Sequence, residues 1–191
     1  MDGEFAIKKA YESILQHDFE QAVRWFELAI AIKPDCASYH YKLSITYARS
    51  NKLQKAIRHA AQASALDPQD EHYSFHLQHL QAKALLVQAE RLFEDEDSER
   101  LWLAVSLVKR AAEMDPLSLE AFLLMAIAYA RLDEYHLAIR AVKELLKLDP
   151  AHSIGIRLLS EYELKWKNYM QRTSTSGVQK VRKQEHGASE H

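Results

Sequence analysis

Small and apolar residues recur along this chain at fixed distances before its prolines. Alanine lies twelve residues before each of the four prolines, at Ala22, Ala56, Ala104 and Ala138. Apolar residues also lie eight residues before each proline, at Phe26, Ala60, Val108 and Val142, and five residues before, at Ala29, Ala63, Ala111 and Leu145. Because residues three or four apart share one side of a helix, the pattern predicts an amphipathic helix before each proline.

The prolines themselves mark a repeat. Pro34, Pro68, Pro116 and Pro150 are separated by 34, 48 and 34 residues, and each follows an apolar and then a charged residue. Proline ends a helix and biases the residue before it away from helical geometry. Self-similarity at a period of this size is typical of repeat architectures, so each proline is expected to close one structural unit.

A second helix is expected earlier in each unit. Ala10, Ser44, Gln78 and Ala126 occupy one further column, and three of these residues are small enough to let two helix backbones approach closely. Breaks between the two helices are predicted near residues 16–18, 50–51, 94–98 and 132–133. At these breaks Asp18, Asn51, Ser98 and Asp133 are the expected N-caps of the second helices.

The third unit is longer than the others by 14 residues. Residues 72–93 contain no helix breaker, so one long first helix is predicted there, followed by an acidic loop at residues 94–97. In this alignment Gln78 stands where the other units have a small residue. The alternative is that Gln78 marks a shifted register and that the additional residues are accommodated elsewhere.

One more amphipathic helix is predicted after Pro150, over residues 153–172. Leu159, Tyr162, Trp166 and Tyr169 fall at helical spacing, as expected for a cap over the apolar face of the last repeat. Residues 173–191 are rich in Thr, Ser, Gln, Lys and Glu, and this composition predicts a disordered tail.

The repeat resembles the tetratricopeptide repeat family over residues 3–152. The second unit carries Leu43, Ser44, Tyr47, Ala56, Ala63 and Pro68, and the fourth carries Phe122, Ala126, Tyr129, Ala138 and Pro150. The resemblance implies an all-α, right-handed α-solenoid of antiparallel helix hairpins. The expected divisions are repeats at 3–36, 37–70, 71–118 and 119–152, a capping helix at 153–172 and the tail at 173–191.

Composition removes several classes of function. The chain of 191 residues has only four glycines and none between residues 4 and 154, which excludes glycine-rich phosphate loops from that stretch. Its single cysteine, Cys36, forms neither an internal disulfide nor a CxxC zinc site. The sequence shows no signal peptide, myristoylation pattern or long apolar run, so we expect a soluble cytoplasmic protein that is not an enzyme and has no cofactor.

Three histidines raise a question of metal binding. His72, His76 and His79 lie at i, i+4 and i+7 on one face of the predicted long helix. Two histidines at i and i+4 can chelate a transition metal, and a third on the same face makes a site conceivable. The alternative is that they line a binding groove as neutral, hydrogen-bonding aromatic side chains.

The resemblance also implies a function, because in this family the first helices line a concave groove that binds a peptide or helix of a partner protein. The residues expected in the groove are Ile7, Tyr11, Tyr41, Ile45, Phe75, His79, Leu123 and Ile127, rimmed by Lys42, Arg49, Lys83 and Arg131. Ile7, Tyr11 and Ile45 stand where some relatives carry a clamp for a terminal carboxylate, so an apolar helix or extended peptide fits better. The competing interpretation buries some of these residues within the repeats.

A second class of partner remains open. Residues 164–183 contain six basic residues and no acidic one, interleaved with Trp166 and Tyr169. Such a segment could bind nucleic acid or an anionic surface. However, basic residues near a helix end also suit its dipole, and the whole chain has a net charge of −2. A protein partner is therefore the main expectation, without a small-molecule substrate.

Overall fold

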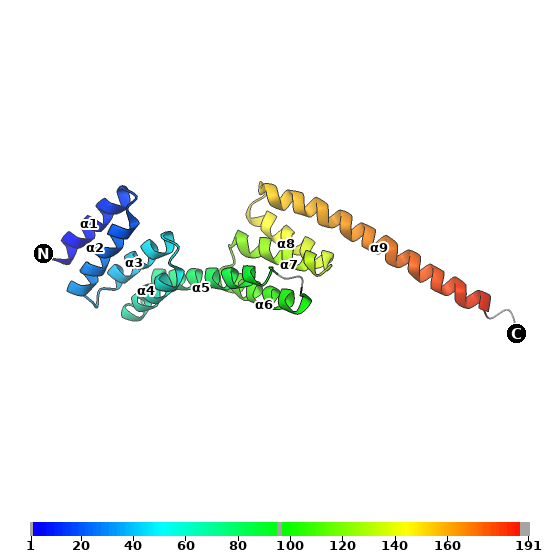
Figure 1. Ribbon diagram of the computed structural model, residues 1–191, viewed down its shortest axis with the longest axis horizontal. Coiled ribbons are helices and arrows are strands. Elements are labelled where there is room, and N and C mark those ends of the chain that lie inside the picture. The colour runs from blue at the N-terminus through cyan, green and yellow to red at the C-terminus, as the bar shows by residue number, and fades with distance from the viewer. Residues whose placement is uncertain (1, 95–96, 188–191) are drawn as a thin grey trace. The chain divides into compact units, whose positions relative to one another are not determined.

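The computed structural model describes residues 2–94 and 97–187, with side chains as far as Arg172. Within this part of the chain the regular structure is entirely α-helical, as predicted (Figure 1). The helices are α1 (Gly3–Leu15), α2 (Phe19–Ile32), α3 (Ala37–Arg49), α4 (Leu53–Leu66), α5 (Glu71–Arg91), α6 (Ser98–Met114), α7 (Leu119–Arg131), α8 (Tyr135–Leu148) and α9 (Ser153–Gly187).

The chain divides into two compact units. Unit 1 comprises Met1–Leu85 with Glu113–Asp115, and unit 2 comprises Leu86–Ala112 with Pro116–His191. In unit 1, α1 packs on α2, α2 on α3 and α3 on α4; in unit 2, α7 packs on α8 and α8 on α9. Sequential antiparallel hairpins are the packing that the two-helix period predicts.

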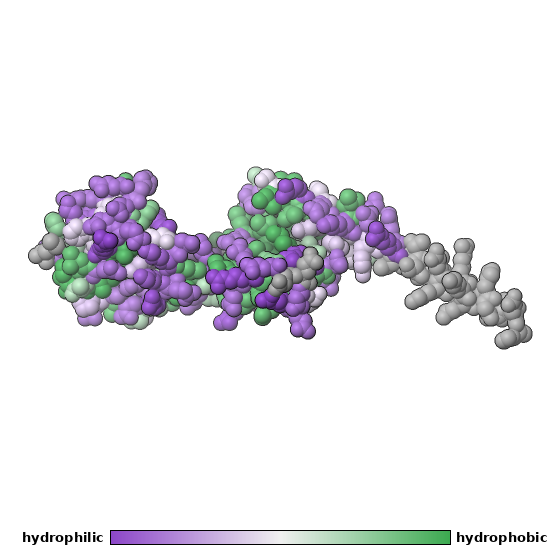
Figure 2. All heavy atoms as spheres, viewed as in Figure 1, coloured by the Kyte–Doolittle hydropathy of each residue, from purple (hydrophilic) through white to green (hydrophobic). Residues whose placement is uncertain are grey.

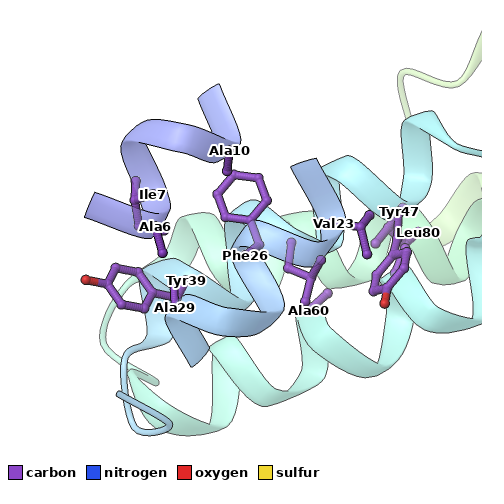
Figure 3. Packing of buried hydrophobic residues seen from close by; sticks show 12 residues of the cluster. Ala6, Ile7, Ala10, Val23, Phe26, Ala29, Tyr39, Tyr47, Ala60 and Leu80 are labelled. Carbon is purple, nitrogen blue, oxygen red and sulfur yellow. The ribbon is translucent and has the colours of Figure 1, made fainter. Parts of the chain in front are cut away.

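The alanine columns lie at the centres of these hairpins. Ala22, Ala56, Ala104 and Ala138 are all fully buried. In unit 1 the core also contains Phe26 of α2, which is 1% exposed and lies beneath α1 in the close view of Figure 3. A methyl side chain at each crossing lets the helices approach closely, so the repeated alanine is a packing requirement.

The turns inside the hairpins use a left-handed residue in place of glycine. His17, Asn51 and Asp133 have φ angles of 60°, 58° and 57° at equivalent positions. In the first turn the N–H of Asp18 donates to the carbonyl of Ser13 at 2.9 Å, which is the long hydrogen bond of a Schellman motif. Asn and Asp tolerate this conformation better than most residues, and histidine is also enriched there.

Only part of the N-cap predictions is confirmed. Asp18 caps α2 as expected, because its carboxylate accepts a hydrogen bond from the N–H of Gln21 at 2.9 Å. The predictions for Asn51 and Asp133 are wrong, since both are the left-handed turn residues and the helices begin one residue later. At α6, the Asp97 carboxylate accepts from the N–H of Glu99, so Ser98 is already the first helical residue.

The long helix of the third repeat is confirmed as α5, but its alignment is shifted. Gln78, expected at a close helix crossing, is exposed. The side chains that α5 buries are Leu80, Ala82, Leu86 and Ala89, each at most 2% exposed. The reason is physical: an amide that found no hydrogen-bond partner in the core would lose free energy, so the apolar face sets the rotation of the helix.

The C-terminal helix docks through its first part. Gly155, Leu158 and Tyr162 are buried, and a Cβ at Gly155 would lie 2.4 Å from Leu145 Cδ2 of α8. A Cβ at this position would therefore displace the Leu145 side chain, whereas glycine permits the close approach.

The helix also continues further than predicted. α9 reaches Gly187, whereas we expected the helix to end at residue 172 and a disordered tail to follow. Residues 188–191 lie outside the described part of the chain.

None of the helices in the described part of the chain combines the length and the hydrophobicity that a membrane span requires.

Candidate partner-binding surfaces

Two aromatic side chains of the predicted groove are exposed in unit 1. Tyr11 of α1 is 44% exposed and packs edge-to-face against Phe26, with ring centroids 6.0 Å apart. Phe75 of α5 is 60% exposed. A large apolar side chain that contributes little to the core is available for contact with another molecule.

Tyr41 lies on an aromatic support between α3 and α5. It is half-buried, with its ring 5.2 Å from that of Tyr73 and 5.0 Å from that of His76. Nearby, the Ser44 hydroxyl donates to the carbonyl of Ala56 at 2.8 Å and lies 2.9 Å from His76 Nε2. Since the one hydroxyl proton is already used, His76 Nε2–H is the donor to Ser44. The support therefore holds Tyr41 in place.

The prediction that Ile7 lines the groove is wrong. Ile7 is 6% exposed and belongs to the core of unit 1 with Tyr39 (Figure 3). The Tyr39 hydroxyl donates to Glu4 Oε1 at 2.6 Å, and this hydrogen bond raises the pKa of Tyr39 to about 12. Because Tyr39 of α3 covers this part of α1, Ile7 is a packing residue.

The other predicted residues take intermediate positions. Ile45, Leu123 and Ile127 are half-buried, and the last two pack at the edge of the core of unit 2. Arg49 and Lys83 are exposed. The two remaining cations contact aromatic rings: Lys42 Nζ lies 6.0 Å from the Tyr39 ring, and the Arg131 guanidinium lies 5.9 Å from the Phe93 ring.

The three histidines of α5 have separate roles. His76 bonds to Ser44, and burial lowers its pKa below the usual value. His79 Nδ1 lies 2.8 Å from the carboxylate of Asp115, and His72 is exposed. Within the described residues, no three His, Cys, Asp or Glu side chains are grouped as a metal ion would require.

Sequence reasoning missed a polar pocket between α3 and α4. It has a volume of about 440 Å³ and is lined by His40, Tyr47, Lys55, Arg58, His59 and Gln62. The His59 ring stacks on Tyr47, with centroids 5.6 Å apart and planes 28° apart. The Tyr47 hydroxyl donates to Glu27 Oε1 at 2.6 Å, so the floor of the pocket is fixed from α2.

A histidine pair closes one side of this polar pocket. His40 Nε2 lies 3.0 Å from the carbonyl oxygen of Pro34 and must be the donor there. In the neutral state His40 Nδ1 is then an acceptor, and it lies 3.0 Å from His59 Nδ1, which supplies the proton. Burial, followed by the proximity of His40, lowers the pKa of His59.

Unit 2 contains a second pocket, which is mainly apolar. It has a volume of about 350 Å³ and is lined by Lys109, Phe122, Met125, Tyr129, Leu137, Arg140, Ala141 and Glu144. Lys109 Nζ lies 5.7 Å from the Tyr129 ring, and Trp102 packs edge-to-face on the same ring at 6.2 Å. Apolar residues gather over α7 and α8 on the face shown in Figure 2.

Comparison with known proteins agrees with the helical hairpins. The family model described as tetratricopeptide repeat matches residues 119–152, which correspond to α7 and α8. Among solved structures, the chain is similar to a MamA RS-1 double mutant, with 15% identity over 99% of this chain and 97% of that one and a TM-score of 0.54.

A second MamA structure gives the same result. The protein comprising residue 41 to the end of MamA from Desulfovibrio magneticus RS-1 has 16% identity over 98% of this chain and 97% of that one, with a TM-score of 0.53. At such identities the likeness shows the fold alone. Comparison with curated proteins gives no match.

Proposed function

We propose that this chain, whose residues 119–152 match the tetratricopeptide-repeat model, is a protein–protein interaction module that serves as an adaptor or scaffold. The observation that carries the proposal is the exposure of Tyr11 and Phe75 on first helices, 44% and 60%, while the second helices supply the alanine columns of the core. Exposed aromatic residues supply much of the binding free energy at protein interfaces.

The proposed contact surface in unit 1, here called the first-helix face, consists of Tyr11, Tyr41, Ile45 and Phe75. Lys42, Arg49 and Lys83 provide cations around it. An amphipathic helix or an extended apolar peptide of a partner fits such a surface, with acidic flanking residues favoured by the cations. In unit 2 we propose the same role for Leu123, Ile127 and Arg131.

The test is quantitative recovery of a partner by full-length protein from a lysate of the source cells. Phe75→Ala and Tyr11→Ala should each reduce recovery at least about fivefold, the effect of losing about 1 kcal/mol of binding free energy. The matched control is Ile32→Ala, because Ile32 is 43% exposed but lies on a second helix. Equal losses from Ile32→Ala, or no loss from the other two variants, would contradict the proposal.

The same experiment separates the alternative partner class. Lys167 and Arg172 are exposed on α9, beyond the residues that this helix buries. If recovery disappears with nuclease, and Lys167→Gln with Arg172→Gln reproduces the loss, the basic helix is the binding element and the first-helix face is not. We expect recovery to resist nuclease.

A further inference from the structure

The two pockets occupy equivalent places in two different hairpins. The lining residues correspond one to one when the sequence is aligned on Pro68 and Pro150. In this alignment His40, Tyr47, Arg58 and His59 of unit 1 match, in order, Phe122, Tyr129, Arg140 and Ala141 of unit 2. The second helix of the preceding repeat contributes as well: Glu27 and Lys109 each lie seven residues before their own proline. The pockets are therefore repeats of one structural position with different side chains.

The decisive difference is the residue that stacks on the pocket tyrosine. In unit 1 the imidazole of His59 covers Tyr47, with ring centroids 5.6 Å apart. In unit 2 the corresponding residue is Ala141, and beside Tyr129 there is a pocket of about 350 Å³. Unit 1 thus shows from within the molecule which group this position accommodates: a planar aromatic ring parallel to the tyrosine.

The other lining residues of the unit 2 pocket suit a ring less polar than imidazole. Leu137 replaces Lys55, and Phe122 replaces His40, so the walls are apolar. Aromatic rings gain both from the burial of apolar area and from stacking. A volume of this size lies in the range that binds small groups, and a phenyl or indole side chain fits within it.

The charges at the rim favour an acidic neighbour of that ring. Glu144 is already paired, because its carboxylate accepts from Lys147 Nζ at 2.7 Å. Lys109 and Arg140 form no ion pair with any described residue. Two cations beside a paired carboxylate leave a positive rim, which complements a carboxylate next to the bound ring.

We propose that the pocket formed by α6, α7 and α8 binds an aromatic side chain of a partner protein, with an adjacent acidic residue placed against Lys109 and Arg140. This site lies between the helices of a hairpin and does not include the residues of the first-helix face. The two proposals therefore succeed or fail independently.

The experiment uses the full chain with ¹³C-labelled methionine methyl groups, because Met125 lines the pocket whereas Met114 and Met170 do not. The probe is the capped peptide acetyl-Asp-Phe-Glu-amide. It should shift the Met125 methyl signal saturably, since the phenyl ring lies within van der Waals distance. The matched peptide with Ala in place of Phe should leave that signal unchanged.

Variants of the protein give the second arm. Ala141→His rebuilds the histidine of unit 1 in the pocket and should weaken peptide binding at least tenfold, whereas Ala151→His, on an exposed turn, should not. Lys109→Gln and Arg140→Gln should each weaken binding of this peptide about two- to fivefold. They should not affect the neutral analogue with Asn and Gln, and this arm remains informative if Ala141→His fails to fold.

Several outcomes would overturn the proposal. Equal Met125 shifts from the Phe and Ala peptides would mean that no ring enters the pocket. Unchanged binding by folded Ala141→His would place the peptide elsewhere. If the Met125 methyl signal did not shift with the peptide but shifted with protein concentration, the occupant of the pocket would be a second copy of this chain.

Discussion

The pockets of the two units share a backbone position but differ in chemistry. In unit 1 a histidine pair, a tyrosine–glutamate hydrogen bond and two cations make the position polar, and His59 fills the place above Tyr47. In unit 2 the corresponding walls are Phe122 and Leu137, and Ala141 supplies no ring to stack on Tyr129, which Trp102 contacts edge-to-face. In a repeat fold the backbone sets which positions lie close together in every repeat. The side chains of each repeat then determine whether that space is filled or open to a ligand.

Overpacking the alanine column should have the largest effect, and it should be alike in both units. Ala56→Trp and Ala138→Trp place an indole where no exposed surface remains, and each should lower the free energy of unfolding by about 1–3 kcal/mol or more. Thermal unfolding followed by circular dichroism measures the loss. Ala61→Trp on the exposed side of α4 is the control and should be nearly neutral. If either of these variants kept its stability, the two hairpins would not share the same close packing at the alanine.

Removing the tyrosine hydroxyl should affect stability differently in the two pockets. Tyr47→Phe removes the 2.6 Å hydrogen bond to Glu27 and should cost about 1–2 kcal/mol, because hydrogen bonds to charged groups are the stronger ones. The hydroxyl of Tyr129 makes no hydrogen bond to a described residue, so Tyr129→Phe should change stability by less than about 0.5 kcal/mol. Denaturant titration compares the two variants. Equal costs would remove the contrast between the polar and apolar pockets.

Substitution by glycine at the left-handed turn residues should increase the stability of the protein. His17→Gly relieves a φ of 60° that L-residues adopt at a cost, and should stabilise the protein by about 0.5–1 kcal/mol. Asp133→Gly tests the corresponding turn of unit 2, where the gain should be smaller because Asp tolerates this conformation better. The Asp133 carboxylate also accepts from the Tyr135 hydroxyl at 2.7 Å, which opposes the gain further. A loss of stability in His17→Gly would contradict the strain assigned to the turn.

Acid should affect the polar pocket through His59, and this effect should be the smallest. Burial and His40 lower the pKa of His59, with Arg58 and Lys55 acting in the same direction and Glu27 opposing them. The unfolded chain, with a pKa near 6.5, therefore binds the proton first. The stability that His59 contributes is present above about pH 6.5 and is lost as the pH falls towards the folded-state pKa. Melting temperature should decline less steeply between pH 7 and 5 in His59→Phe than in the natural sequence; an equal decline would exclude His59 as a cause.

The fold was largely predictable because it depends on packing that repeats. Alanine at the same offset from each proline leaves few arrangements other than stacked hairpins, and the long α5 followed from the absence of a breaker. The rotation of α5 was not predictable from the repeat alignment, since the alignment places Gln78 in the core and the molecule exposes it. Asn51 was ambiguous for a local reason: the same residue type suits an N-cap and a left-handed turn.

The candidate sites were less predictable than the fold. Ile7 and Tyr11 lie four residues apart on one side of α1, yet only Ile7 is covered, because Tyr39 of the next hairpin reaches it. Helical spacing reports which residues share a side but not how far a neighbouring helix extends over it. The pockets were missed because side chains from different helices form them. The proline alignment did contain the signal, since it pairs His59 with Ala141.

Binding of partners to the first-helix face can be tested by site-specific photo-crosslinking, which reports contact at a single residue. Benzoylphenylalanine placed at position 75 preserves an exposed aromatic group, and the same residue at position 32 reports the exposed side of a second helix. We expect a discrete crosslinked partner from position 75 and none from position 32. A partner captured from position 32 but not from position 75 would contradict this expectation.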